Sequence, residues 1–161
     1  MPATAHHIPQ ECTPGDVTLL NQAIIAYNAS QVPFTQQVPF INIDFVIKDA
    51  LDKVIGGILS YLYCWGCLYI DILWIDEAFR HQGYGTLLLQ AVERTAQEQG
   101  CSLIHLDTFD FQAKDFYCQQ GYEVFGTLEG CPPGHMRYYL KKDLPRVTDN
   151  ISTNLAPPDT R

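Results

Sequence analysis

A short loop with two glycines, Arg80-His81-Gln82-Gly83-Tyr84-Gly85, follows the apolar residues Leu73-Trp74-Ile75 and leads directly into a helical pattern. The first N–H groups of a helix have no partner within the helix, and the helix macrodipole adds about half a positive charge at that end. Because glycine has no side chain, a phosphate group can approach the loop backbone closely. Residues 80–86, ending at Thr86, are therefore predicted to bind a pyrophosphate.

The elements around this loop form a predicted strand, helix and strand unit over residues 68–108. Apolar and polar residues alternate at helical spacing as far as Gly100, a residue typical of a helix end. Residues 101–108 are short and apolar, as a buried strand is. The predicted apolar face of the helix consists of Leu87, Leu88, Ala91, Val92, Thr95 and Ala96, and its polar face of Gln90, Glu93, Arg94, Gln97 and Glu98.

Two classes of phosphate-binding motif fit such a unit. A dinucleotide fingerprint requires G-x-G-x-x-G, and Asp107 lies near the distance expected of its ribose-binding acid. Leu88 stands where the third glycine belongs, and the sequence shows no second mononucleotide-binding half, which argues against a dinucleotide oxidoreductase. The alternative pattern, Arg/Gln-x-x-Gly-x-Gly/Ala, matches residues 80–85 without a mismatch.

With this hexapeptide the chain resembles the GCN5-related N-acetyltransferase (GNAT) superfamily, whose shared acetyl-coenzyme A motif follows a strand in the same way. Residues 113–122, Ala-Lys-Asp-Phe-Tyr-Cys-Gln-Gln-Gly-Tyr, are similar to a second family signature, A-x-x-F-Y-x-x-x-G-[FY]. The resemblance covers roughly residues 16–144 and is that of a small, bacterial-type, single-domain member. It implies acetyl-coenzyme A (acetyl-CoA) as cosubstrate, with contacts from Trp74, Ile75, Arg80, His81, Gln82, Gly83, Tyr84, Gly85, Thr86, Asp110, Ala113 and Phe116.

Two positions depart from the family pattern. Glu77 stands where many members have proline, which affects only a turn. Asp110 stands where many have asparagine, and a carboxylate cannot donate the hydrogen bonds that an amide donates to the cofactor. Asp110 also fits the position of an N-cap for the helix that carries Tyr117. Arg80 is expected either to neutralise pyrophosphate charge or to tie the loop to the strand end.

Acetyl transfer to an amine requires a proton acceptor for the amine and a proton donor for the departing thiolate. Tyr117 matches the family tyrosine near the cofactor sulfur, although Ala113, Phe116 and Tyr117 also share a helical face that suits a core. Asp71 is the predicted base, because it alternates with Tyr69 and Leu73 on one side of a strand. The other side of that strand is predicted to be wholly apolar, with Leu68, Ile70, Ile72 and Trp74.

Both catalytic assignments have alternatives. Asp71 also fits a solvated sheet residue or a hydrogen-bond acceptor that faces a helix. His135, at the end of the turn Pro132-Pro133-Gly134, titrates in a useful range and is a second candidate base, although a lone loop histidine is more often ordinary surface.

The composition restricts the class of partner. Ten Lys and Arg against 18 Asp and Glu give a formal charge of −8, which argues against nucleic acid and anionic membrane surfaces and favours a cationic substrate. No apolar run approaches the roughly 20 residues of a spanning helix, so a cytoplasmic protein is expected. The six cysteines form no framework, and Cys64-Trp65-Gly66-Cys67 suits a hairpin with a two-residue turn better than a zinc site; no metal is expected.

The expected architecture is an α+β fold in one domain, residues 1–144, with an N-terminal arm over 1–15 and a disordered tail over 145–161. A helix from a cap at Asp16 to Asn28 precedes strands at 40–47, 54–64 and 67–75, with a bulge at Gly56-Gly57, and strands at 122–129 and 135–142 end the domain. The resemblance implies a three-layer α/β/α sandwich whose mixed, mostly antiparallel sheet has one splayed parallel strand pair. Backbone groups near Ile75 would then be free to bind the pantetheine amides, and a homodimer through the last strands is implied.

The function expected from these observations is transfer of an acetyl group from acetyl-CoA to a primary amine of a small molecule or peptide. A non-catalytic module that holds coenzyme A, as a sensor or an assembly partner, is the alternative. The same loop chemistry serves both, so the two are separated by activity and not by binding.

Overall fold

The computed structural model describes residues 9–145, which divide into two compact units, the first ending at Phe34 and the second beginning at Thr35. The predicted tail and most of the predicted arm lie outside the described residues. In the part of the chain that is described, no helix is long and apolar enough to cross a membrane.

The first unit contains helix α1, Pro14–Gln31, which begins at a capping box. The Thr13 side chain accepts from the Asp16 N–H, and the Asp16 carboxylate accepts from the Thr13 N–H at 2.8 Å. Thr13 is therefore the N-cap, and the prediction that Asp16 caps the helix is wrong. Asp16 occupies the third helical position instead, because Pro14, which needs no hydrogen-bond partner for its nitrogen, begins the helix.

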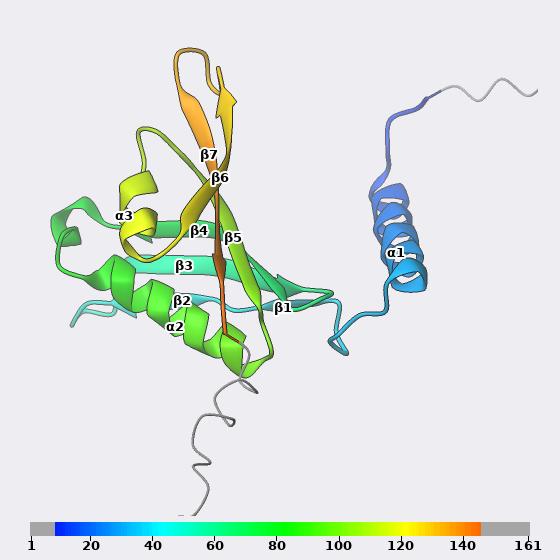
Figure 1. Cartoon of the computed structure of the whole chain (residues 1–161), viewed down its shortest axis with the longest axis horizontal. Coiled ribbons are helices and arrows are strands. Elements are labelled where there is room, and N and C mark those ends of the chain that lie inside the picture. The colour runs from blue at the N-terminus through cyan, green and yellow to red at the C-terminus, as the bar shows by residue number, and fades with distance from the viewer. Residues whose placement is uncertain (1–8, 146–161) are drawn as a thin grey trace, which may run out of the picture. The chain divides into compact units, whose positions relative to one another are not determined.

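The second unit is built on one mixed sheet, in the order β1-β3-β4-β5-β7-β6, with β2 also paired to β3 (Figure 1). Among the described strands, only β4 and β5 run parallel, and the other pairs are antiparallel, as the sequence predicted. The strands are β1 Phe40–Asn42, β2 Phe45–Lys48, β3 Val54–Tyr63, β4 Cys67–Ile75, β5 Leu103–Phe109, β6 Glu123–Glu129 and β7 Met136–Asp143.

Two predictions about this sheet need correction. The strand expected over residues 40–47 is two strands, because the chain leaves the ladder at Ile43-Asp44 and the Asp44 carboxylate accepts from the Ser60 N–H at 2.9 Å. The bulge expected at Gly56-Gly57 lies one residue earlier, at Ile55. Ile47 pairs with Gly56 and Lys48 pairs with Val54, which leaves Ile55 as the extra residue.

The turn between β3 and β4 also differs from its prediction. Cys67 pairs with Tyr63, so the turn has three residues and the two cysteines of Cys64-Trp65-Gly66-Cys67 do not face each other across it. Gly66 has φ +70°, and a Cβ there would lie 2.9 Å from the carbonyl oxygen of Gly100. Glycine is needed at this position both for its backbone conformation and for the close approach to the end of the next helix.

Helices α2, Tyr84–Glu98, and α3, Lys114–Gln119, pack on the sheet, α2 along β2, β3 and β4 and α3 beside β6 (Figure 1). A short 3-10 helix, η1 (Glu77–Phe79), links β4 to the loop before α2. Leu88, Leu89, Val92 and Ala96 of α2 are buried, whereas Leu87, which was predicted to lie on the apolar face, is 57% exposed. Gly100 follows the helix at φ +82° as expected. The hydrophobic core lies between these helices and the strands, with Ile58, Leu62, Leu68, Ile104, Leu106 and Leu140 from the sheet.

Glu93 belongs to this interface and not to the polar face predicted for it. Its carboxylate accepts from the Lys142 Nζ at 2.8 Å and from the Tyr122 hydroxyl at 3.0 Å. Lys142 also donates to the Gln120 carbonyl at 2.9 Å, and both charged side chains are mostly buried. The pair therefore ties α2 to the end of α3 and to β7.

Removal of one partner would leave the other charge desolvated without compensation, so Lys142→Met is expected to lower the free energy of unfolding by about 3 kcal/mol. Lys48→Met is the matched control, since Lys48 forms an exposed pair with Asp52 and its loss should cost less than about 1 kcal/mol. Urea unfolding of the two variants measures the difference. Equal losses would show that the Glu93–Lys142 pair contributes no more than a surface pair.

Candidate active site

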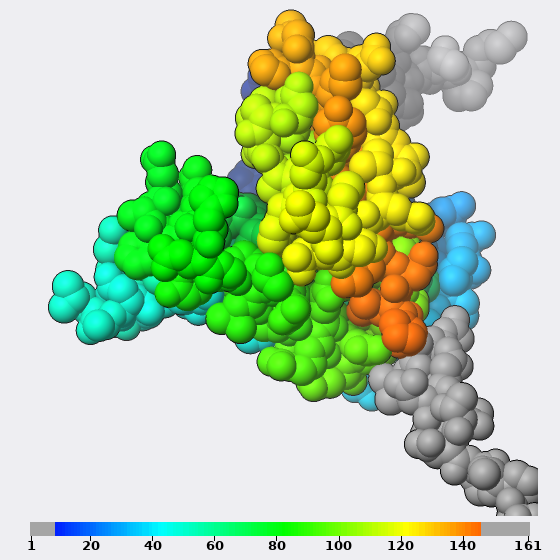
Figure 2. Space-filling model, turned by 60° about the vertical axis from the view of Figure 1, so that its left-hand side comes forward, coloured from blue at the N-terminus to red at the C-terminus, as the bar shows by residue number. Residues whose placement is uncertain are grey.

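Strands β4 and β5 separate where the predicted site begins. Their parallel pairing ends at Ile70 and Leu106, although β4 continues to Ile75 and β5 to Phe109. The separation opens a cleft of about 880 Å³ that runs from the start of α2 to α3 and reaches the sheet at Asp71 and Asp107. Figure 2 shows the surface hollowed between the green segment, which carries η1 and the start of α2, and the yellow segment of α3. The splayed strand pair expected from the sequence is therefore present.

The α2 end of the cleft has the features of an anion site. Gly83 precedes the helix at φ +85°, and no side chain among residues 9–145 caps the exposed N–H groups there. A Cβ on Gly83 would meet no described atom within 4 Å, so the backbone faces open space. A Cβ on Gly85 would lie 3.4 Å from the Phe116 ring of α3, so this part of the loop faces α3 across the cleft wall. The first glycine exposes the helix start.

The loop before α2 is held by side-chain bonds to the chain that precedes it. The Arg80 Nε donates to the Ile75 carbonyl at 3.1 Å, so Arg80 ties the loop to the strand end. The Ile75 carbonyl accepts this bond and keeps a second lone pair, so the binding of pantetheine amides by backbone groups near Ile75 stays a prediction. Gln82 donates its amide to the Ala78 carbonyl and lies outside the residues that line the cleft. His81 has φ +60° and lines the cleft.

Asp71 sits at a β-bulge in β4. Ser60 pairs with Ile70 and Leu59 pairs with Ile72, so Asp71 is the extra residue between two ladder positions. A bulge reverses the alternation of faces, and Leu73 and Ile75 therefore join the core. Ile72 and Trp74 are 47% and 46% exposed, which corrects the prediction that they continue the buried face of Leu68 and Ile70. The Asp71 side chain is exposed and lines the cleft.

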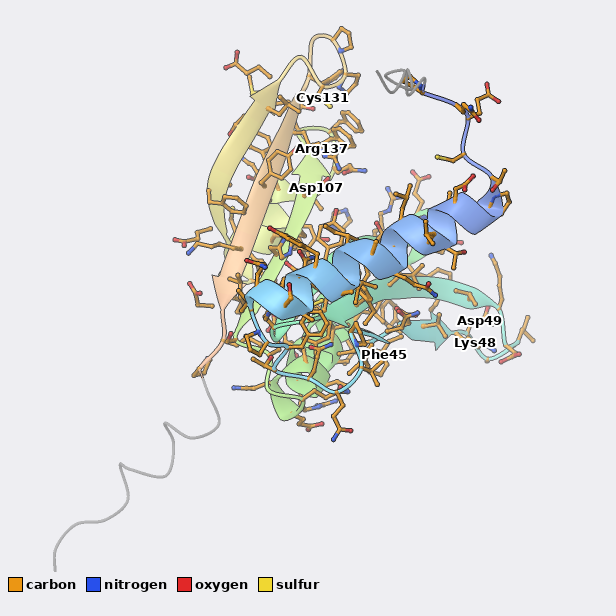
Figure 3. The ribbon with its side chains drawn as sticks, turned by 90° about the vertical axis from the view of Figure 1, so that its right-hand side faces the viewer. Phe45, Lys48, Asp49, Asp107, Cys131 and Arg137 are labelled. Atoms are coloured by element: carbon orange, nitrogen blue, oxygen red, sulfur yellow. The ribbon has the colours of Figure 1, made fainter. Side chains whose placement is uncertain are left out.

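Asp107 also lines the cleft, although its position in the sequence suggested only the ribose-binding acid of a dinucleotide fold. Its Oδ1 accepts from the Tyr69 hydroxyl at 2.6 Å, and its Oδ2 accepts from the Arg137 Nε at 2.6 Å. Figure 3 shows Arg137 beside Asp107, one on β7 and the other on β5. Burial raises the pKa of Tyr69, and so do the hydrogen bond to Asp107 and the charges of Asp107 and Asp71. Both carboxylates therefore act on the same hydroxyl at the point where the strands separate.

Tyr117 lies in α3 with 5% of its surface exposed, and it lines the cleft while its ring packs on Phe116 and Tyr122. Tyr117 therefore belongs both to the hydrophobic core and to the wall of the cleft. Burial, and next the charge of Asp107, raises the pKa of the Tyr117 phenol. The phenol therefore stays protonated at neutral pH and can donate to a developing anion.

Tyr117→Phe is expected to reduce the acetylation rate constant about tenfold, because one hydrogen bond to a charged group contributes roughly 1.5 kcal/mol or more. Affinity for acetyl-CoA should not change. Tyr122→Phe is the control, since Tyr122 is equally buried and its hydroxyl bonds Glu93, outside the cleft; it should lower stability and leave turnover intact. Stopped-flow or steady-state thiol release separates the two, and full turnover in Tyr117→Phe would assign the hydroxyl to packing alone.

Asp110 and His135 meet at the cleft's outer edge, where the His135 Nδ1 lies 3.0 Å from the Asp110 Oδ1. The predicted role of Asp110 as N-cap is wrong, because Ala113 occupies that position in α3. The preceding turn is held by Gln112, whose side-chain oxygen accepts from the Thr108 hydroxyl and the Phe109 N–H. Asp110 lines the cleft with Ala113 and Phe116, so the predicted cofactor contacts, apart from Gln82, gather around one space.

Neither a disulfide nor a metal site is found among the residues that the structure describes. All six cysteines are free thiols, and burial, with a smaller effect of Cys67, raises the pKa of Cys64. Across residues 9–145, no three side chains of His, Cys, Asp and Glu are placed to hold a metal ion.

Known proteins share this arrangement. The sequence model of the acetyltransferase (GNAT) family matches residues 17–122. Blasticidin-S acetyltransferase of Streptomyces morookaense is 34% identical over 93 residues, which are 57% of this chain and 68% of the relative. The crystal structure of an acetyltransferase from Bacillus cereus ATCC 14579 superposes with a TM-score of 0.78 at 36% identity, covering 88% of this chain and all of that one.

A candidate streptothricin acetyltransferase from Bacillus anthracis str. Ames, solved in complex with acetyl coenzyme A, has a TM-score of 0.58 at 21% identity, covering 65% of this chain and 63% of that one. At that identity the likeness concerns the fold. The family match spans well over half of the sequence and includes the strand, loop and helix that form the anion site. The chain therefore belongs to the GNAT family of acetyltransferases.

Proposed function

We propose that this protein transfers an acetyl group from acetyl-CoA to a primary amine of a small molecule or peptide. One observation carries the proposal: a single cleft joins the uncapped start of α2 to two carboxylates, Asp71 and Asp107, at the point where β4 and β5 part. The helix start suits a diphosphate, and the exposed Asp71 carboxylate suits an ammonium group, whereas Asp107 is already paired with Arg137. Donor and acceptor chemistry thus meet inside one space.

The residues fit acetyl-CoA, which would supply the acetyl thioester. The N–H groups of Gly83, Tyr84, Gly85 and Thr86 would hold the diphosphate, and Phe116 and Ala113 would line the wall beside it. Asp71 would take the proton that the acceptor ammonium must lose before it becomes a nucleophile. Tyr117 would hold a proton at its hydroxyl oxygen for the departing sulfur, as the C–N bond forms and the C–S bond breaks.

Two measurements test the proposal. Calorimetry should show binding of acetyl-CoA and of free coenzyme A, and no comparable binding of a nicotinamide dinucleotide. Release of free thiol in the presence of a panel of amines should then show turnover, with blasticidin S included because a relative is named for its acetylation. Binding without thiol release from any amine would favour the alternative, a non-catalytic coenzyme A module.

Two further parts of the proposal concern the protein's setting. A cytoplasmic location follows from the need for acetyl-CoA, and a homodimer through β6 and β7 follows from the family resemblance. Fractionation of cells and sedimentation of the purified protein test these two points separately.

A further inference from the structure

A second, smaller hollow lies on the face of the sheet that points away from α2. It has a volume of about 340 Å³. Its residues alternate along the strands with core residues such as Leu62 and Ile104, which places them on the opposite face. The hollow is lined by Phe40 of β1, Tyr61 and Tyr63 of β3, Tyr69 of β4 and His105 of β5.

The rings of this hollow are inclined to one another. Tyr61 is central, with its ring centroid 6.2 Å from Phe40 at 65° and 5.6 Å from Tyr69 at 49°. Tyr69 and His105 lie 5.1 Å apart at 52°. Rings at these distances and angles pack edge to face on one another and leave no parallel slot for a flat ligand. The hollow that they line offers aromatic surface to a compact cation, and in this sense it is an aromatic cage.

The walls of the hollow carry no charge that would repel a cation at neutral pH. Burial lowers the pKa of His105, against a smaller opposing effect of Asp107, so the imidazole is neutral. The Tyr63 hydroxyl is 2.7 Å from the His105 Nε2, and burial is the main cause that raises the Tyr63 pKa to about 12. The same face of the sheet already has a cation–π contact. The Arg137 guanidinium carbon lies 5.4 Å from the centroid of the Phe109 ring and 5.8 Å from that of the Tyr139 ring.

Tyr69 connects the hollow to the active-site cleft. Its ring is a wall of the hollow, and its hydroxyl donates to Asp107, which lines the cleft. His105 and Asp107 are two residues apart on β5 and point to the same face, a separation of roughly 7 Å at about 3.3 Å per residue. A ligand can therefore extend from the carboxylates to the cage without leaving this face.

We propose that the acceptor is a dication with its two positive groups roughly 7 Å apart. This inference rests on the proposed function. The primary ammonium that becomes acetylated lies against the exposed Asp71 carboxylate, and the second cationic group lies in the cage beside His105, two residues along β5 from Asp107. The chain's formal charge of −8 adds a general attraction for such a substrate.

Three simple amines test the spacing and the charge. 1,5-Diaminopentane has the required separation, pentylamine has the same length with one charge, and 1,3-diaminopropane has two charges that lie too close. A cation on rings contributes about 0.5–2 kcal/mol, so kcat/KM for 1,5-diaminopentane is expected to exceed that for each of the others about tenfold, through a lower KM. A wild-type enzyme that acetylates amines without this preference would overturn the inference.

Two variants of Tyr61 show whether the cage is responsible. Tyr61→Phe keeps the ring and should keep the preference, whereas Tyr61→Leu should make the KM values for 1,5-diaminopentane and pentylamine nearly equal. A structural role alone would change the melting temperature and both KM values together, and an unchanged preference in Tyr61→Leu would also overturn the inference. Failure of the proposed function is distinct, because it would appear as lost acetyl-CoA binding in calorimetry or as no thiol release with any amine.

Discussion

Gly83→Glu is expected to weaken the binding of acetyl-CoA by about 100-fold or more. The substitution adds a negative charge at the open start of α2, where the diphosphate would lie. Two unit charges about 4 Å apart repel by about 4 kcal/mol at an effective dielectric near 20, and every 1.4 kcal/mol changes affinity about tenfold. Calorimetric titration with acetyl-CoA measures the dissociation constant directly.

Gly100→Glu is a closely matched control for this experiment. Gly100 has φ +82° against +85° at Gly83, and at both positions a Cβ would meet no described atom within 4 Å. Both variants should lose about 1–2 kcal/mol because a non-glycine residue is strained in the left-handed region, and Gly100→Glu should lose slightly more because its carboxylate lies at the negative end of α2. Only the variant at the start of α2 should lose affinity. Equal dissociation constants in the wild type and both variants would place the diphosphate elsewhere.

Asp71→Asn is expected to lower kcat by about 100-fold, since a positioned general base contributes roughly 10²–10⁴ in rate. The amide has nearly the same shape as the carboxylate but cannot accept the amine proton. Affinity for acetyl-CoA should not change, because Asp71 lies at the opposite end of the cleft from the helix start. Thiol release at saturating amine and acetyl-CoA measures the effect.

Asp115→Asn controls for the loss of one negative charge in the same cleft. Asp115 lines the cleft from α3, and its side chain is largely exposed and paired with Lys114. Turnover should be preserved in this variant. If Asp71→Asn keeps wild-type turnover as well, Asp71 is a solvated sheet residue and the proton leaves by another route, for which the Asp110–His135 pair is the next candidate.

The sequence was most informative where one physical signal decided the structure. The helical spacing of apolar residues between two glycines determined α2, and β4 was predicted with the residues that it has, Cys67–Ile75. Glycine loops before a helix have a single strong interpretation, because the exposed N–H groups at a helix start have few alternative uses. Consequently the open, uncapped start of α2 was predictable from residues 80–86, and its binding of a pyrophosphate stays a prediction.

The carboxylate end was less accessible to sequence reasoning. The bulge at Asp71 could not be foreseen, because Ile72 and Trp74 are apolar whichever face they take. Asp107, Tyr69 and Arg137 meet only because β7 enters the sheet beside β5 and β4 lies on the other side. Partners that are 30 and 38 positions apart in sequence carry no local signal.

The one-residue bulge at Asp71 divides β4 into two halves that turn opposite sets of alternating residues toward the core. Before it, Tyr69 belongs to the aromatic face while Leu68 and Ile70 anchor the core; after it, Leu73 and Ile75 take over the anchoring. Without the bulge, every second side chain of β4 would have faced the core from one end of the strand to the other. The inserted residue lets β4 remain paired with β3 throughout and still part from β5, so the gap between β4 and β5 opens without loosening the rest of the sheet.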